Sequence, residues 1–190
     1  MSRKNRWKTK KEDAQHYDRV AAIYDVQYRE EQERKYRAAL DATRVSKCGY
    51  ILDLGCGTGL FDEEAAKLGD FVIGVDHSAK MLKKAKQKHN DQRTFFLCAD
   101  ADKLPFAEET FDRTFSFTML QNIPYPEKTV TEICRVSKKG SEVVLSVPKK
   151  TFTRSSFLHI LDGTGLSLAK FIDEEELKDY IAVCKNMGNE

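Results

Sequence analysis

The chain has 190 residues, of which 41% are hydrophobic and 33% are charged, and its formal net charge is +2. This length and composition favour one soluble globular domain, and the small net charge weakens the case for a dedicated nucleic-acid-binding protein. The cysteines number five and form no C-x-x-C pair, so the sequence predicts neither a disulfide framework nor a zinc site. No apolar run has the length of a membrane span, and the N-terminus lacks an apolar signal core. We therefore expect a reducing, cytoplasmic location.

The N-terminal part of the chain divides into a basic stretch and a helical stretch. Residues 1–12 place six Lys or Arg around a single Trp, and we expect a basic flexible tail there. The alternative is an arm that contacts nucleic-acid phosphates. From Asp13 to about Arg44, apolar residues recur at three- and four-residue steps, which predicts two helices or one broken helix. We treat residues 13–190 as a single domain that begins with a helical lid at 13–44.

Strand-like apolar runs and amphipathic helical segments alternate through the middle of the chain. Such alternation predicts βαβ units, a parallel sheet with helices on both faces, and a binding site at the carboxyl ends of the strands. Ser78 is a suitable N-cap for one of these helices. The expected strands are 50–54, 71–75, 94–99, 111–117 and 142–147, and the expected helices are 60–68, 78–89 and a segment that follows Pro126.

After Pro148 the pattern is less regular. Apolar residues at 157–161 predict a short helix, and 167–172 allows one short strand. Leu177, Ile181 and Cys184 would share one face of a helix over 173–184.

Three glycines at alternate positions follow the first expected strand, in the run ILDLGCGTG over 51–59. Glycine permits a sharp turn and a close approach of a ligand to the backbone, whereas an ordinary tight turn is the plain alternative. A dinucleotide-binding fingerprint would need a further glycine where the sequence has Leu60. Asp53 would repel a pyrophosphate and attract a cationic amino group. The run therefore favours a cofactor with an amino-acid end over NAD.

The segment Asp53–Gly59, DLGCGTG, resembles motif I of the class I S-adenosylmethionine-dependent methyltransferases. The similarity covers roughly residues 13–148. It implies a Rossmann-like α/β fold, a three-layer sandwich around a mostly parallel sheet, with S-adenosyl-L-methionine as the cofactor. The loop residues that the resemblance assigns to cofactor binding are Asp53, Gly55, Cys56, Gly57 and Gly59.

Two further family motifs follow at the ends of later strands. Asp76 ends the second expected strand, where the family uses an acidic residue to bind the ribose hydroxyls; a helix cap or surface position is the alternative. His77 and Met81 would help to wall the adenosine, although Met81 fits plain core packing equally well. Asp100 and Ala101 follow the third strand, where the family reads the adenine with an acidic residue and a backbone amide.

The residues just past the fourth expected strand correspond to the acceptor side of the family's site. On this resemblance Thr118 is assigned to the cofactor, and Leu120, Gln121 and Asn122 to the methyl acceptor. The alternative is that these residues begin a helix and contact only solvent. Asn122 also opens N-I-P-Y, which resembles the N-P-P-Y motif of amino-group methyltransferases. This segment begins about four residues after the end of the strand, where the motif would start directly, and it has Ile123 in place of the first proline. We therefore do not interpret it as that motif.

The segment His16–Asp25 is similar to the Y/F-D-x-x-A-x-x-Y-D segment of small-molecule methyltransferases, including quinone-biosynthesis enzymes. In those proteins the helix covers the cofactor and a tyrosine approaches its carboxylate, so Tyr17 and Tyr24 are assigned to cofactor binding. Plain packing of two tyrosines on one helix face is the alternative. No residue is assigned as a catalytic base, because methyl transfer needs one only if the acceptor must lose a proton.

The C-terminal pattern departs from that of the family. A complete class I domain ends with two further strands, the last antiparallel and inserted beside the fifth. With a helix over 173–184, only six residues would remain after it. The sequence therefore allows that the C-terminal strands are missing. The strand at 142–147 would then be an exposed edge, open to pairing in a homodimer.

Taken together, these patterns predict an S-adenosylmethionine-dependent methyltransferase that acts on an unidentified acceptor. The resemblance of the lid segment favours a small molecule. One alternative is a tRNA or rRNA methyltransferase that grips the RNA backbone with the basic tail. Another is a cofactor-binding partner subunit without catalytic activity, and a nicotinamide oxidoreductase is the most distant reading.

Overall fold

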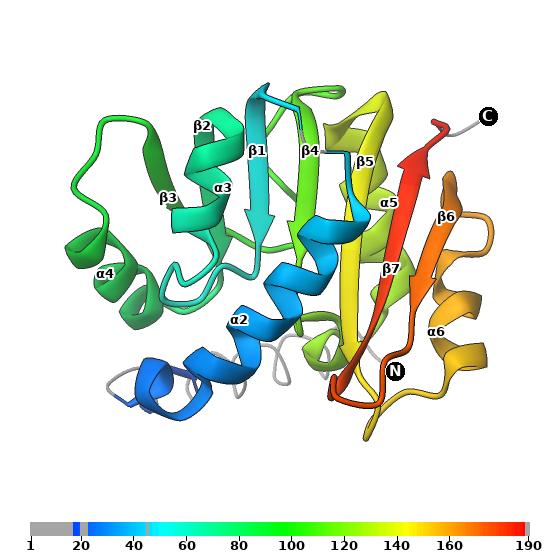
Figure 1. The fold of residues 1–190 in the computed structure, drawn as a ribbon. Coiled ribbons are helices and arrows are strands. Elements are labelled where there is room, and N and C mark those ends of the chain that lie inside the picture. Colours follow the sequence, from blue (N-terminus) through cyan, green and yellow to red (C-terminus); the bar gives the residue numbers. More distant parts are fainter. Residues whose placement is uncertain (1–16, 20–22, 45, 189–190) are drawn as a thin grey trace.

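The structure of the chain, a computed structural model, describes residues 17–19, 23–44 and 46–188. The expected basic tail at 1–12 and His16 lie outside these residues. Figure 1 shows one sheet with helices on both of its faces. The strands are β1 Cys48–Leu54, β2 Gly69–Asp76, β3 Thr94–Cys98, β4 Phe111–Ser116, β5 Ser137–Pro148, β6 Leu166–Ile172 and β7 Asp179–Asn186. The helices are α2 Tyr24–Ala42, α3 Asp62–Leu68, α4 Ala79–Lys88, α5 Pro126–Val136 and α6 Arg154–Leu161, with a 3-10 helix, η1, at Leu120–Asn122.

The described sheet has seven strands in the order β3-β2-β1-β4-β5-β7-β6. Strands β1 to β5 are parallel, and β7 lies antiparallel between β5 and β6. The order reverses beside β1, because β2 and β3 lie on one side of it and β4 and β5 on the other. Such a reversal leaves a crevice at the carboxyl ends of the two central strands. The predicted α/β sandwich with a mostly parallel sheet is confirmed.

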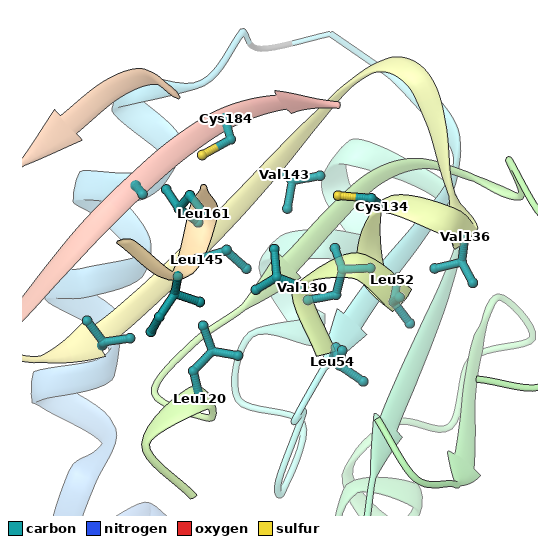
Figure 2. Packing of buried hydrophobic residues seen from close by; sticks show 14 of the residues in the cluster. Leu52, Leu54, Leu120, Val130, Cys134, Val136, Val143, Leu145, Leu161 and Cys184 are labelled. Carbon is teal, nitrogen blue, oxygen red and sulfur yellow. The ribbon is translucent and has the colours of Figure 1, made fainter. Parts of the chain in front are cut away.

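One face of the sheet packs against α5 and α6. Leu52 of β1 and Leu145 of β5 lie in the same apolar cluster as Val130 of α5 and Leu161 of α6 (Figure 2). The helices contribute every third or fourth residue to this cluster, and the strands contribute alternate residues, as their geometries require. Burying each such side chain contributes roughly 1.5–3 kcal/mol to the hydrophobic driving force.

The opposite face packs against α2, α3 and α4. Tyr36 of α2 contacts Phe61 and Phe117, with ring-centroid distances of 5.0 and 4.9 Å. These contacts hold α2 across the sheet, so that its N-terminal end reaches the carboxyl ends of β1 and β4 (Figure 1). The predicted cap of α4 is confirmed: the Ser78 hydroxyl accepts a hydrogen bond from the backbone N–H of Met81 at 3.2 Å.

The predicted C-terminal helix over 173–184 is wrong, because Asp179–Asn186 form strand β7. The charged residues at 173–178 favour a helix locally, but the apolar residues that follow are buried on both faces of the strand, between β5 and β6. A strand in the middle of a covered sheet has a continuous apolar run instead of alternation, and such a run can be mistaken for a helix face.

The C-terminal strands are therefore present. The short strand expected at 167–172 is confirmed as β6, and β5 is paired on both sides. The argument for a homodimer through an exposed β5 edge does not hold, because the edges of the described sheet are β3 and β6. No helix within the described ranges is long and apolar enough to cross a bilayer.

Candidate functional site

A pocket opens at the carboxyl ends of β1 to β4, where the strand order reverses. The parallel sheet brings residues together there that are far apart in the sequence. The pocket is lined by ten of the residues predicted to bind the cofactor: Tyr17, Tyr24, Gly55, Gly57, Asp76, His77, Met81, Asp100, Ala101 and Thr118.

The glycine turn presents bare backbone to this pocket. Gly55 and Gly57 have φ angles of 82° and 57°, which glycine adopts without steric cost. The N–H of Gly55 donates to the Val75 carbonyl at 2.7 Å, which ties the turn to β2. A Cβ at Gly55 would lie 2.7 Å from Cγ of Met119, whereas a Cβ at Gly57 would meet no atom within 4 Å. Because Gly57 lines the pocket, a side chain there would occupy ligand space.

Asp76 is fixed by the backbone on both sides of its carboxylate. Its Oδ2 accepts from the N–H of Gly57 at 2.9 Å, and its Oδ1 accepts from the N–H of Ser78 at 2.7 Å. Burial raises the pKa of Asp76, and these backbone donors act against that rise. Each oxygen retains further acceptor capacity. The carboxylate is therefore oriented to accept hydrogen bonds from neighbouring hydroxyl groups of a ligand.

Tyr17, in the segment that precedes α2, and Tyr24, at the start of α2, line the pocket. The hydroxyl of Tyr17 accepts from Nδ2 of Asn122 at 2.8 Å, and the Tyr17 and Tyr24 rings lie 6.4 Å apart in an edge-on contact. Burial raises the pKa of the Tyr24 phenol, which therefore stays protonated at neutral pH. The carboxylate of Asp18 accepts from the Ser78 hydroxyl at 2.6 Å and so joins this segment to α4. The two tyrosines pack on each other and line the pocket at the same time.

Thr118 stands at the end of β4 in a left-handed conformation, with a φ angle of 52°. Its hydroxyl donates to Oδ2 of Asp179 at 2.9 Å and accepts from Nζ of Lys35. The same Asp179 oxygen accepts from the Ser146 hydroxyl at 3.0 Å and lies 2.9 Å from Nζ of Lys35. Lys35 and Asp179 are each only 1% exposed. Burial lowers the pKa of Lys35, and the charge of Asp179 opposes that shift.

Little in the sequence pointed to this network of Thr118, Asp179 and Lys35. Lys35 comes from α2 and Asp179 from β7, the strand that was predicted as a helix. The only available signal was a lysine next to Tyr36, on a helix face that the structure buries. Lys35 was therefore missed because helical periodicity does not distinguish a buried charge from a solvated one.

Asp53 was predicted to attract the cationic end of the cofactor, but it lies behind the glycine turn instead of lining the pocket. It is 2% exposed and faces Asp62 of α3, which is fully buried. Burial raises the pKa of both carboxyls, that of Asp62 to about 6. Among the described residues, no donor reaches Oδ2 of Asp53 or either oxygen of Asp62 unless one of the two carboxyls keeps its proton. A shared proton then joins the pair by a hydrogen bond, and Asp53 shapes the site from behind.

Three other predicted residues also lie outside the pocket lining. The Cys56 side chain is buried beneath the turn. Gly59 is required by packing, since a Cβ there would lie 2.9 Å from both Oδ2 of Asp62 and Nε2 of His89. Leu120, predicted to bind the acceptor, is 1% exposed and points from η1 into the apolar cluster (Figure 2).

A second cavity adjoins the pocket and shares Tyr17, Tyr24, Thr118 and Asn122 with it. We call it the acceptor cavity, because two residues predicted for the acceptor line it. One is Asn122, and the other is Gln121, whose Oε1 is buried without a hydrogen-bond partner among the described residues. Its charged lining consists of the lysines and the carboxylates at positions 31, 149, 150, 178 and 179.

Comparisons with known proteins agree with this geometry. Residues 52–145 match the methyltransferase domain family. The chain is 35% identical over 150 residues to the demethylmenaquinone methyltransferase of Paenarthrobacter aurescens, a match that covers 77% of this chain and 58% of the relative. It is 40% identical over 96 residues to the malonyl-[acyl-carrier protein] O-methyltransferase of Buchnera aphidicola, covering 50% of this chain and 38% of the relative. The chain belongs to the class I S-adenosylmethionine-dependent methyltransferases. It spans less than two thirds of the length of either relative.

Two solved structures of methyltransferases share the fold. A chain of the complex between the Haloferax volcanii Trm112 methyltransferase activator and a methyltransferase gives a TM-score of 0.75 at 19% identity, covering 90% of this chain and 97% of that one. A methyltransferase from Aquifex aeolicus gives a TM-score of 0.72 at 17% identity, covering 80% and 89% of the two chains. The likeness at these identities concerns the arrangement of the sheet and helices.

The pocket of this class I methyltransferase fits S-adenosylmethionine, the cofactor of the family. Gly57 leaves open space where a side chain would stand, and the fixed Asp76 carboxylate faces the pocket beside it. Asp100 and Ala101 line the part beyond β3, where the family reads the adenine. The donor set is one of hydroxyl, carboxylate and backbone groups, which suits a nucleoside.

Proposed function

We propose that this protein transfers a methyl group from S-adenosylmethionine to a small-molecule acceptor. The observation that carries the proposal is the Asp76 carboxylate, held at 2.9 and 2.7 Å by the backbone of Gly57 and Ser78 in the lining of the pocket. The relatives that act on a quinone precursor and on malonyl-acyl-carrier protein support a small acceptor. Five free thiols support a reducing, cytoplasmic location.

In this proposal, Asp76 binds the ribose hydroxyls, and His77 and Met81 wall the nucleoside. Asp100 and Ala101 bind the adenine edge. The bare backbone at 55–57 approaches the amino-acid end, and Tyr17, Tyr24 and Thr118 close the site above it. The cofactor supplies a sulfonium methyl group with a neutral leaving group.

The residues of the chain contribute orientation and the exclusion of water. Holding two reactants in line accounts for up to about 7–11 kcal/mol of barrier lowering in favourable cases. The contact between Tyr17 and Asn122 keeps the segment that carries Tyr17 over the junction of the two cavities. Thr118 lines the same junction, so the acceptor and the cofactor meet beside it.

Calorimetry with S-adenosylmethionine and S-adenosylhomocysteine tests the cofactor site. The wild-type chain should bind both, whereas NADH should not bind. Asp76→Asn should weaken binding by about tenfold or more, since one charge-assisted acceptor is worth roughly 1.5–3 kcal/mol. Asp70→Asn is the matched control, because Asp70 is exposed at the other end of the same strand, and it should leave affinity unchanged. Equal affinity in Asp76→Asn and wild type, with both folded by circular dichroism, would refute the assignment.

A further inference from the structure

The acceptor cavity has an unusual lining for a site that would receive a hydrophobic substrate. Besides the tyrosine rings, its wall consists almost entirely of polar and charged side chains, with Pro148 as the exception. A prenylated quinone would have to bury its chain against this wall at the cost of desolvating it. The lining therefore favours a small polar acceptor, and the charges within it indicate which kind.

Both carboxylates of the cavity are already neutralised by lysines. Asp179 lies 2.9 Å from Nζ of Lys35, in a pair that is almost fully buried. Glu31 Oε2 lies 2.6 Å from Nζ of Lys178 at the rim. Neither carboxylate contributes a free negative charge to the cavity.

Two more lysines face the cavity, and only one of them has a partner. Nζ of Lys149 lies 2.7 Å from Oδ1 of Asp173 and donates to the carbonyl of Glu174 at 2.7 Å. Lys150 is exposed and has no ion pair or hydrogen bond with any described residue. The paired charges cancel, so the described lining carries one net positive charge, at Lys150.

Among the described lining residues, the groups that could remove a proton from an acceptor are already engaged; Glu31, for example, is paired with Lys178. No histidine is among its described lining residues. Oδ2 of Asp179 already accepts hydrogen bonds from Thr118 and Ser146 as well as the charge of Lys35, and burial raises the pKa of Tyr24, which keeps its proton. An acceptor that reacts here must therefore be nucleophilic without being deprotonated by the protein.

We propose that the methyl acceptor is a small-molecule carboxylate, drawn into the cavity by Lys150 and converted to a methyl ester; this rests on the proposed function above. A lone pair of the carboxylate oxygen forms the new O–C bond while the C–S bond breaks, and its electron pair stays on sulfur. No proton moves, which agrees with a described lining whose two carboxylates are each paired with a lysine. The negative charge of the acceptor also complements the positive sulfonium at the junction beside Thr118.

Nuclear magnetic resonance titrations can detect such an anion site with a simple probe. The full chain, labelled with nitrogen-15 and saturated with S-adenosylhomocysteine, is titrated with sodium acetate at constant ionic strength and, separately, with acetamide. Acetate should shift the backbone amide signals of Thr118, Lys150 and Thr151, and acetamide should not. Lys150→Gln should weaken acetate binding about fivefold, the effect of one exposed ion pair of about 1 kcal/mol.

Lys139→Gln is the matched control. Lys139 is an exposed lysine of β5, on the same strand that leads to Lys150, but at its opposite end. It should bind acetate as the wild type does. The proposal is overturned if acetate shifts none of these signals, if acetamide shifts them equally, or if the two lysine variants behave alike. It is also overturned if a quinol acceptor is methylated at a rate that Lys150→Gln does not change.

The two proposals fail in different ways. If S-adenosylhomocysteine does not bind in the preliminary calorimetry, the proposed function fails. If it binds and the acetate titration gives any of the contrary results, only the carboxylate acceptor is refuted.

Discussion

The ends of β1 and β4 are neighbours in the sheet, and both turn sharply at the pocket with left-handed backbone. At the end of β1 the turn is made by glycines, with the Asp53 and Asp62 carboxyls buried behind them. At the end of β4 it is made by Thr118, with Asp179 buried behind it. Both strand ends therefore combine a tight turn with a buried carboxyl group, but different residues form the turn.

The difference concerns how strain and charge are compensated. Glycine has no steric cost at positive φ, whereas a non-glycine residue there costs roughly 1–3 kcal/mol. Thr118 recovers this cost through hydrogen bonds with Asp179 and Lys35. Asp179 has the Lys35 ammonium 2.9 Å away. The neighbouring His89 and Lys88 oppose the rise in the pKa of Asp62 but do not cancel it, so burial raises the pKa of both Asp53 and Asp62 and favours a proton on the pair. The β4 end thus depends on an ion pair, and the β1 end on protonation.

Breaking the ion pair between Lys35 and Asp179 should have the largest effect on the free energy of unfolding. Asp179→Asn leaves the buried Lys35 ammonium without its counter-charge, and the unfolding free energy should fall by about 3–5 kcal/mol. Lys35→Met should cost a similar amount, because the Asp179 carboxylate is then unpaired. Urea unfolding, followed by circular dichroism, measures both.

The double variant separates the charge from the packing. Lys35→Met combined with Asp179→Asn removes both charges and keeps the two shapes, so its stability should recover to within about 1–2 kcal/mol of the wild type. Additive losses in the double variant would show that the two residues stabilise the fold independently of their mutual attraction.

Titration of the acid pair should have the next largest effect. The pKa of Asp62 is raised from its ordinary value of 3.8 to about 6 by burial. A raised folded-state pKa contributes stability that is complete below about pH 4 and is lost as pH rises through about 6. Asp62→Asn should remove this part of the pH dependence, which amounts to roughly 2–3 kcal/mol between pH 4 and 8. Chemical unfolding at a series of pH values measures it.

Glu63→Gln is the control for that experiment. Glu63 stands beside Asp62 in the first turn of α3, but its side chain is exposed. The Glu63→Gln substitution therefore removes one negative charge near the same end of the helix without changing the buried pair. Its pH profile should follow the wild type. Parallel profiles for wild type and Asp62→Asn would mean that the buried pair does not titrate in this range.

The features that could be predicted from the sequence are those with a local signal. Asp76 follows an apolar strand, Ser78 precedes an amphipathic helix, and the glycines at 55–59 join the two kinds of pattern. Each was assigned from its own few residues, and the structure brings Asp76 and Gly57 into contact through backbone geometry. The carboxyl ends of the strands of a parallel sheet meet at one edge. Predicting the strand positions was therefore enough to predict where the pocket lies.

The features that could not be predicted depend on contacts between distant segments. The ion pair joins α2 to β7, and β7 itself was mistaken for a helix because charged helix-forming residues precede it. Asp53 was placed in the pocket because its position relative to the turn was known but the direction of its side chain was not. In a strand, that direction alternates with each residue, and Asp53 faces α3.

Substitution of Gly57, in the turn at the end of β1, should have the smallest effect on stability. Gly57 and Gly140 both have positive φ angles, 57° and 79°, and a Cβ would meet no atom within 4 Å of either. Replacing either by alanine should therefore cost only the backbone strain, about 1 kcal/mol of unfolding free energy. Gly57 lines the pocket and Gly140 does not, so only Gly57→Ala should weaken S-adenosylhomocysteine binding, by roughly tenfold. If calorimetry gives both variants the same affinity, the bare backbone at position 57 serves the turn alone, and the β1 end then differs from the β4 end only in how it buries its acid.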